Sequence, residues 1–163
     1  MKTIYLSLGS NLGDREANLR AALGLLVRAD IRVRRVSPVY ETEPVGCGRQ
    51  RWFLNLAVEA ETTLFPVQLL HRTARIERAL GRVRTVPHGP RTIDIDILLY
   101  GSAVVRSTHL EIPHPRLHKR RFVLQPLYDL KPELRHPLLG RTMLELLEAA
   151  PPQALHRRQP GLP

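Results

Sequence analysis

The alternation of apolar and polar residues predicts four strands and two helices in the first hundred residues. In the strands, apolar residues either fill a short run or recur at every second position. In the helices they recur every three or four residues, and the second helix is bounded by Pro66 at its start and Gly81 at its end. The expected strands are 2–8, 31–42, 52–61 and 93–99, and the expected helices are 15–29 and 66–80.

The order of these elements predicts the fold class. A β-α-β-β-α-β order gives two interleaved βαβ units, which form the α+β ferredoxin-like arrangement: a four-stranded antiparallel sheet with both helices on one face. Pro38 lies inside the second strand and indicates an edge position or a bulge. Residues 102–150 are expected to add an irregular C-terminal extension with short helical turns and one final helix, within a single domain over 1–150. We expect residues 151–163 to form a disordered tail.

Strand side chains alternate, so each strand has one face toward the helices and one face away from them. The apolar positions expected under the helices are Trp52, Leu54, Leu56, Val58, Ile93, Ile95 and Ile97. Phe53, Asn55, Asp94 and Asp96 are then left together on the opposite face. The sequence therefore predicts that an aromatic ring, an amide and two carboxylates converge where no helix covers them.

Asp94 and Asp96 form an unusual pair within an apolar strand. Two carboxylates roughly 6–7 Å apart repel each other, and burying them without a cation is unfavourable. A pair of Mg²⁺ ions fits them, because Mg²⁺ takes few protein carboxylates and completes its shell with water and substrate phosphates. Two such ions would neutralise charge on a transferred phosphoryl group. A structural network of ion pairs with nearby arginines fits the same two residues equally well.

Composition narrows the class of protein. The chain has 163 residues, of which 43% are hydrophobic and 25% charged, as in one globular domain with a core. No apolar run is long enough to span a membrane, and the single cysteine, Cys47, excludes an intrachain disulfide. We therefore expect a cytoplasmic protein. The net charge of +10 indicates either an anionic partner or a solvated basic surface.

Several residues near the aspartate pair could bind phosphate. Arg82 and Arg84 follow a glycine in a loop and could form a cationic flap, although for either arginine alone a solvated loop charge is the favoured interpretation. Arg91 is fixed at the start of the aspartate strand. His114 lies between two prolines and could donate to a phosphate, and Glu77 could orient an arginine or simply lie on an exposed helix face. The loop GSNLGD lacks the Lys-Ser/Thr of a P-loop.

Seven segments make the pattern specific: SLGSNLGD, SPVYETEPVG, FLN, IERALGRVR, GPRTIDIDILLYG, IPHPRLHKRRFVLQPL and DLKPEL, in that order. Over residues 1–145 the chain resembles the hydroxymethyl-dihydropterin pyrophosphokinase family of the folate pathway. The resemblance implies a ferredoxin-like fold, two Mg²⁺ ions, and transfer of pyrophosphate from ATP to the hydroxymethyl group of 6-hydroxymethyl-7,8-dihydropterin, with release of AMP.

The resemblance also implies roles for individual residues. Asp94 and Asp96 look like the ligands that hold both metal ions against the ATP phosphates, and Glu77 looks like a residue on the nucleotide side. The expected phosphate contacts, of which the first three would also act in catalysis, are Arg82, Arg84, Arg91, His114 and Arg120. The expected pterin pocket consists of Thr42, Pro44, Val45, Phe53, Asn55, His88 and Phe122.

Two positions depart from the family pattern. The family commonly places a basic residue and then an aromatic before GPR, where this chain has Pro87 and His88 in a loop one residue shorter. An aromatic residue that follows the histidine of the later motif in some relatives is Pro115 here. We expect the imidazole of His88 to form one wall of the pterin slot, opposite Phe122.

Two other classes of protein fit parts of the pattern. A basic ferredoxin-like RNA-binding module would need exposed aromatics on its central strands, and TIYLSLG and WFLNLAV lack that pattern. A two-metal nuclease could use the same carboxylates. Neither class would make AMP from ATP only when pterin is present. We therefore expect a monomeric enzyme that binds ATP and a pterin, with no nucleic-acid or membrane partner.

Overall fold

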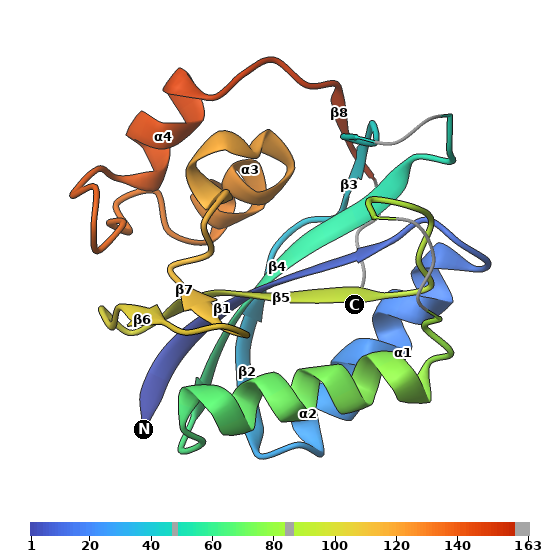
Figure 1. Cartoon of the computed structure of the whole chain (residues 1–163). Helices are drawn as coiled ribbons and strands as arrows, with labels where there is room; N and C mark the ends of the chain where they lie inside the picture. The colour runs from blue at the N-terminus through green and yellow to red at the C-terminus, as the bar shows by residue number, and fades with distance from the viewer. Residues whose placement is uncertain (47–48, 84–86, 159–163) are drawn as a thin grey trace.

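The computed structural model describes residues 1–46, 49–83 and 87–158 as an α+β structure (Figure 1). The strands are β1 (Lys2–Ser10), β2 (Ile31–Val36), β3 (Tyr40–Thr42), β4 (Phe53–Thr62), β5 (Asp94–Tyr100), β6 (Val105–Arg106), β7 (Glu111–Ile112) and β8 (Leu155–Arg157). The helices are α1 (Arg15–Val27), α2 (Pro66–Ala79), the 3₁₀ turn η1 (Leu117–Lys119), α3 (Arg121–Leu130) and α4 (Met143–Ala149).

The main sheet is antiparallel throughout the described residues. Its strands follow the order β5-β1-β4, and both β2 and β3 pair with β4. The expected second strand, 31–42, is divided into β2 and β3 because Pro38 has no N–H to donate to the ladder. The other three expected strands and both expected helices form close to their predicted bounds.

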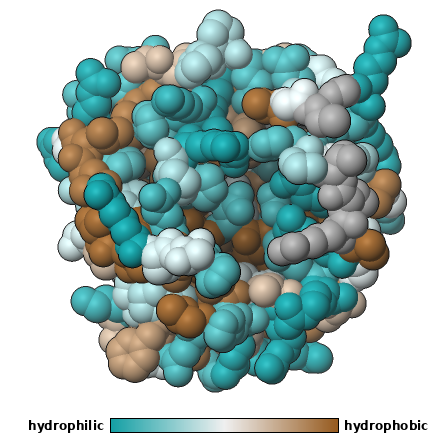
Figure 2. Space-filling view, viewed as in Figure 1, coloured by the Kyte–Doolittle hydropathy of each residue, from teal (hydrophilic) through white to brown (hydrophobic). Residues whose placement is uncertain are grey.

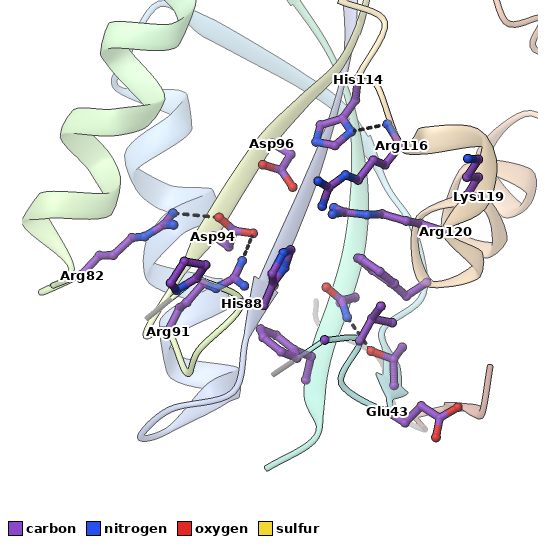
Figure 3. A pocket seen from close by; sticks show the side chains of 18 of the residues that line it. Glu43, Arg82, His88, Arg91, Asp94, Asp96, His114, Arg116, Lys119 and Arg120 are labelled. Atoms are coloured by element: carbon purple, nitrogen blue, oxygen red, sulfur yellow. Dashed lines mark hydrogen bonds and ion pairs between the residues drawn. The ribbon is translucent and has the colours of Figure 1, made fainter. Parts of the chain in front are cut away.

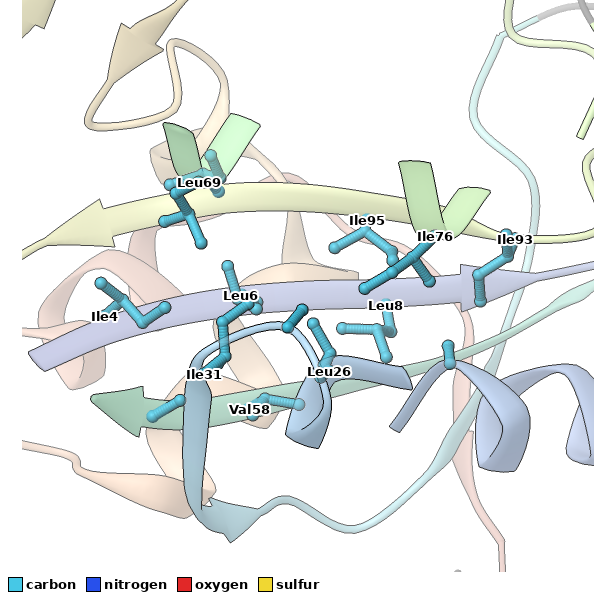
Figure 4. Close-up of a cluster of buried hydrophobic side chains, with 14 of the residues drawn as sticks. Ile4, Leu6, Leu8, Leu26, Ile31, Val58, Leu69, Ile76, Ile93 and Ile95 are labelled. Atoms are coloured by element: carbon cyan, nitrogen blue, oxygen red, sulfur yellow. The ribbon is translucent and has the colours of Figure 1, made fainter. Parts of the chain in front are cut away.

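Helices α1 and α2 lie on one face of this sheet and enclose the larger hydrophobic core with it (Figures 1 and 4). Asp14 caps α1, and its carboxylate accepts a hydrogen bond from the amide of Ala17 at 3.1 Å. The core contains all but one of the apolar positions that alternation predicted: Leu54, Leu56, Val58, Ile93, Ile95 and Ile97. The exception is Trp52, which precedes β4 and stacks on His156 with 5.7 Å between ring centroids.

Helices α1 and α2 lie on one face of the sheet as expected, and the expected final helix forms as α4, but a helical layer on the opposite face was not expected. In Figure 1, α3 and α4 lie across the sheet from α1 and α2, and they bury a second cluster that includes Tyr5, Ala57 and Leu98. The apolar run FVLQPL drives this packing: α3 forms despite Pro126 in its interior because it buries most of its apolar side chains against the sheet. The segment expected to be irregular is thus a second helical layer.

The expected disordered tail was also wrong in part. Leu155–Arg157 forms β8 and pairs with β3, and the amide of Arg158 donates to the carbonyl of Val39 at 2.8 Å. Gln153 accepts from the amide of Phe122 at 3.0 Å and donates to the carbonyl of Glu43 at 2.7 Å. Residues 159–163 lie outside the described part of the chain.

The surface agrees with the charged composition. Hydrophilic side chains cover most of the face shown in Figure 2, and hydrophobic ones gather in smaller patches. None of the helices in the described ranges combines the length and the apolar character needed to cross a bilayer.

Candidate active site

A cavity of about 800 Å³ lies beside the ends of β1, β4 and β5, on the face away from α1 and α2. The loop after β3, the loop before β5 and the segment around η1 complete its walls (Figure 3). Most of the site residues predicted from the sequence line it together: Thr42, Val45, Phe53, Asn55, Arg82, His88, Arg91, Asp94, Asp96, His114, Arg120 and Phe122. Strand alternation predicted the convergence of Phe53, Asn55, Asp94 and Asp96, and the loop motifs and the resemblance supplied the other residues.

Three predicted residues stand apart from this group. Pro44 lies between two lining residues but does not itself line the cavity. Glu77 lies behind the cavity wall on α2. Arg84 lies outside the described residues.

A buried amide shapes the floor of the cavity. Asn55 donates to the hydroxyl of Thr42 at 2.7 Å, from the neighbouring strand β3. Gly9 of β1 pairs with Asn55 of β4, and a Cβ at Gly9 would lie 2.4 Å from Oδ1 of Asn55. The glycine therefore leaves room for the amide, beside the ring of Phe53. The sequence analysis missed Gly9, since only the register of β1 against β4 shows its role.

Asp94 is the centre of an ion-pair network. Its two oxygens accept from Nη1 of Arg82 and Nη1 of Arg91, each at 2.7 Å. Glu77 accepts from the same nitrogen of Arg82 and, at 2.8 Å, from the amide of Ile95. Glu77 thus orients an arginine, one of the two roles considered for it, and ties α2 to β5. At Asp94 the structure shows the ion-pair network, one of the two alternatives considered for the aspartate pair.

Asp96 differs from its neighbour in strand β5. Within the described residues its carboxylate takes part in no hydrogen bond or ion pair. Burial first, and then the charge of Asp94, raise the pKa of Asp96 to about 7. A carboxylate in this state favours a cation beside it.

A divalent metal fits this donor set. The described ranges contain no group of three or more His, Cys, Asp or Glu side chains that could hold a metal alone. Two carboxylates on one strand face, one of them without a partner, suit Mg²⁺, which is usually bound by one or two carboxylates plus substrate phosphates. Asp94 and Asp96 are the residues that would hold it.

His114 is positioned by its own segment. Its Nδ1 accepts from the amide of Arg116 at 3.1 Å, so the proton of the neutral ring is on Nε2 (Figure 3). Burial, and secondly the charge of Arg120, lower the pKa of His114 to about 4. At neutral pH the residue is therefore an uncharged donor at the cavity wall.

The sequence analysis missed three further charged residues of the cavity: Glu43, Arg116 and Lys119. The last two belong to the segment IPHPRLHKRR, where only His114 and Arg120 were selected. The guanidinium of Arg120 lies 5.5 Å from the ring centroid of Phe122. Because Arg120 is half-buried, this cation–π interaction is stronger than it would be at an exposed site. The density of basic residues in this segment was the available signal.

Asn11 was missed as well. Its side chain donates to Oε1 of Gln50 at 2.8 Å and to the carbonyl of Arg51 at 2.9 Å, and it accepts from the amide of Arg91 at 2.8 Å. Three loops that are distant in sequence therefore meet at one amide beside the cavity. This junction holds the backbone that presents Arg91 to Asp94.

Comparison with known proteins decides the family. The family model for 7,8-dihydro-6-hydroxymethylpterin-pyrophosphokinase matches residues 5–132. The chain belongs to this family. It is 50% identical over 127 residues to the Bacillus subtilis 2-amino-4-hydroxy-6-hydroxymethyldihydropteridine pyrophosphokinase, covering 77% of this chain and 76% of that one. The Pseudomonas aeruginosa protein of the same name is 40% identical over 158 residues, covering 96% and 97% of the two chains. The family and the enzyme class expected from the motifs are confirmed.

Solved structures support the fold. A triple mutant of Plasmodium falciparum HPPK-DHPS, crystallised with SDX-DHP, superposes with a TM-score of 0.73 at 18% identity. The match covers 91% of this chain and 44% of that one. The chain also spans only 21% of the Schizosaccharomyces pombe folic acid synthesis protein fol1, at 44% identity. It therefore corresponds to one part of these longer proteins.

Proposed function

We propose that the cavity binds ATP and 6-hydroxymethyl-7,8-dihydropterin next to each other and transfers pyrophosphate between them, as a step of folate biosynthesis. The pterin hydroxyl oxygen attacks the β-phosphorus of ATP in line, and the bond between the α-phosphate oxygen and the β-phosphorus breaks. AMP leaves, and the hydroxyl proton is released. Because little covalent chemistry falls to the protein, its contribution is positioning and electrostatic stabilisation.

The floor and one end of the cavity suit a flat heterocycle. Asn55 and Thr42 offer hydrogen-bonding groups beside Phe53, and the ring of Phe122 and the imidazole of His88 line the same space. The pterin needs a slot with apolar faces and polar edges, and these side chains supply both. Val45 borders this region, and Pro44 precedes it in the chain.

The other side of the cavity suits a polyphosphate. Arg82, Arg91 and Arg120 present guanidinium groups to it, and His114 presents an uncharged N–H. Asp94 and Asp96 would hold two Mg²⁺ ions, which when bound supply positive charge to the phosphate oxygens. Arg84 joins this group by resemblance alone. These arginines fix the phosphates relative to the pterin and exclude water from them.

One observation carries the assignment. The carboxylates of Asp94 and Asp96 and the amide of Asn55 open into one cavity whose other polar walls are largely cationic. A metal-nucleotide site and a heterocycle site thus adjoin within a space of about 800 Å³. Neither an RNA-binding surface nor a nuclease cleft needs the buried amide.

The test is AMP release from ATP, measured with and without the dihydropterin. We expect AMP and pterin pyrophosphate in equal amounts, and only when the pterin and Mg²⁺ are both present. AMP formation without pterin, or salt-sensitive nucleic-acid binding or cleavage without pterin-dependent AMP, would overturn the proposal.

The strand order, with β4 between β1 and β2, supports the ferredoxin-like description of the fold. A single pyrophosphokinase domain over 1–150, a monomeric state and a cytoplasmic location stay predictions.

A further inference from the structure

Three cations line one wall of the cavity. Arg116 and Lys119 are exposed, Arg120 is half-buried, and Figure 3 shows all three across the cavity from Arg82 and Asp94. Within the described residues, their side chains form no ion pair and no hydrogen bond. Arg120 at least has the ring of Phe122 beside it.

Two of these cations lie at the start and at the end of η1. Arg116 immediately precedes this 3₁₀ turn and Lys119 ends it, three residues later. A 3₁₀ helix has three residues per turn, so side chains at i and i+3 lie on the same side. Two cations on one side repel each other in the free protein, and an anion between them would remove that repulsion.

The acids of the cavity are already engaged elsewhere. Asp94 accepts from Arg82 and Arg91, and Glu43 accepts from the amide of Ala154 at 2.9 Å. Asp96 faces Arg120: burial lowers the pKa of Arg120, and the charge of Asp96 opposes that shift. The two exposed cations are therefore available to a ligand.

We propose that Arg116 and Lys119 form an anion subsite at the mouth of the cavity, which binds the polyphosphate of the nucleotide independently of the aspartate pair. The identification of the anion as a nucleotide rests on the proposed function. The geometry by itself requires an anion with several charged oxygens, which both ATP and inorganic tripolyphosphate provide. A single phosphate group, as in AMP, cannot engage both cations and the arginines of the opposite wall.

Binding of inorganic tripolyphosphate with EDTA present tests the subsite, since it needs neither metal nor pterin. We expect Arg116→Gln and Lys119→Gln each to raise the Kd about 3- to 10-fold and to weaken its dependence on salt. Lys119→Arg keeps the charge and should retain the wild-type Kd. AMP should bind much more weakly than tripolyphosphate to the wild type.

The matched controls are Lys2→Gln and Arg28→Gln. Both residues are exposed, and they lie at the ends of β1 and α1 away from the cavity. Each makes the same change in net charge, so each should leave the Kd for tripolyphosphate within about twofold. Equal weakening by the controls, or no weakening by Arg116→Gln and Lys119→Gln, would overturn the subsite.

Steady-state kinetics separates this inference from the proposed function. If the subsite holds the nucleotide, both cavity variants should raise the KM for ATP by more than they lower kcat. Pterin-dependent AMP release by the wild type, with unchanged tripolyphosphate binding by the variants, removes the subsite and keeps the function. Wild-type protein that binds tripolyphosphate through these residues but makes no AMP removes the function and keeps the subsite.

Discussion

The two walls of the cavity hold their cations in different ways. On the wall formed by β5 and α2, Arg82 and Arg91 both donate to Asp94, and Glu77 holds Arg82 from behind. On the wall formed by the η1 segment, Arg116 and Lys119 have no such partner among the described residues. The cations of one wall are therefore held in place by acidic side chains of the protein. The cations of the other wall are not, which is why we propose that they bind an anionic ligand.

This difference assigns different consequences to substitutions on the two walls. Removing a member of the paired wall leaves its former partners without a counter-charge, so stability and turnover should both decrease. Removing Arg116 or Lys119 breaks no side-chain hydrogen bond or ion pair among the described residues. It should change ligand affinity and leave stability unchanged, or raise it slightly through reduced repulsion.

The aspartate pair should give the largest effect. We expect Asp94→Asn and Asp96→Asn each to lower pterin-dependent AMP release by about a thousandfold or more, since each removes charge that the phosphate site requires. Asp94→Asn should also lower the Tm, because Arg82 and Arg91 lose a shared carboxylate. Asp96→Asn should leave the Tm unchanged or raise it, since it breaks no hydrogen bond or ion pair among the described residues and removes the repulsion from Asp94. Near-normal turnover by either variant at ordinary Mg²⁺ contradicts the metal assignment.

The paired arginines should rank next. Arg82→Ala is expected to lower kcat about 10- to 100-fold with a smaller change in ATP affinity, as predicted from the sequence for an arginine that acts on the phosphates after the nucleotide has docked. Arg91→Ala should weaken nucleotide binding more, because the backbone of Arg91 is fixed by Asn11 at the start of β5. Single-turnover rates and titration with a non-hydrolysable ATP analogue measure the two terms. The assignment fails if Arg82→Ala binds ATP poorly yet turns over normally once saturated.

The paired wall could be predicted from the sequence, because strand alternation has a fixed period. Once β4 and β5 were recognised, Asn55, Asp94 and Asp96 had to share the face away from the helices. The second layer could not be predicted in the same way. Pro126 argues against a helix by local propensity, yet α3 forms because Val123, Leu124 and Leu127 bury against the sheet.

The unpaired wall and its supports depend on contacts that no local pattern encodes. Asn11 reaches Arg91 across 80 positions of the chain, and Gln153 reaches Glu43 across 110. Strand β8 has three residues, too few for a period-two pattern to distinguish it from a loop. Arg116 and Lys119 gain their significance only when η1 is placed opposite β5.

The pH dependence of stability tests whether His114 belongs with the unpaired wall. Its pKa of about 4 in the folded protein lies below the ordinary value near 6.5, because of burial and of Arg120. Between these values the unfolded chain binds the extra proton. The contribution of neutral His114 to the free energy of unfolding is therefore complete above about pH 6.5 and is lost as the pH falls toward 4.

His114→Asn keeps an acceptor for the amide of Arg116 but cannot titrate. As the pH falls through this range, its unfolding free energy should gain up to about 2 kcal/mol relative to wild type. Asp94 and Arg116 also face His114 electrostatically, so denaturation should be compared at constant ionic strength. A difference that is independent of pH contradicts the assignment.

Substitutions of His88 should give the smallest effect. His88 belongs to the β5 side of the cavity, yet its imidazole makes no hydrogen bond within the described residues, so it tests whether that side acts only through its ion pairs. His88 has a positive φ of 61° and packs against Gly46. A Cβ added at Gly46 would lie only 2.9 Å from the Cβ of His88. The ring lines the cavity with Phe122, so a larger ring at this position should stack better on the pterin. Aromatic stacking contributes roughly 0.5–1.5 kcal/mol beyond burial, so His88→Trp should tighten pterin binding by up to about tenfold, and His88→Ala should weaken it. Affinity is measured with a non-hydrolysable ATP analogue bound, and Phe122→Leu serves as the control that removes the opposite ring. Equal pterin affinities for wild type, His88→Trp and His88→Ala would show that the pterin does not touch this side chain, and that the β5 side contributes through its ion pairs alone.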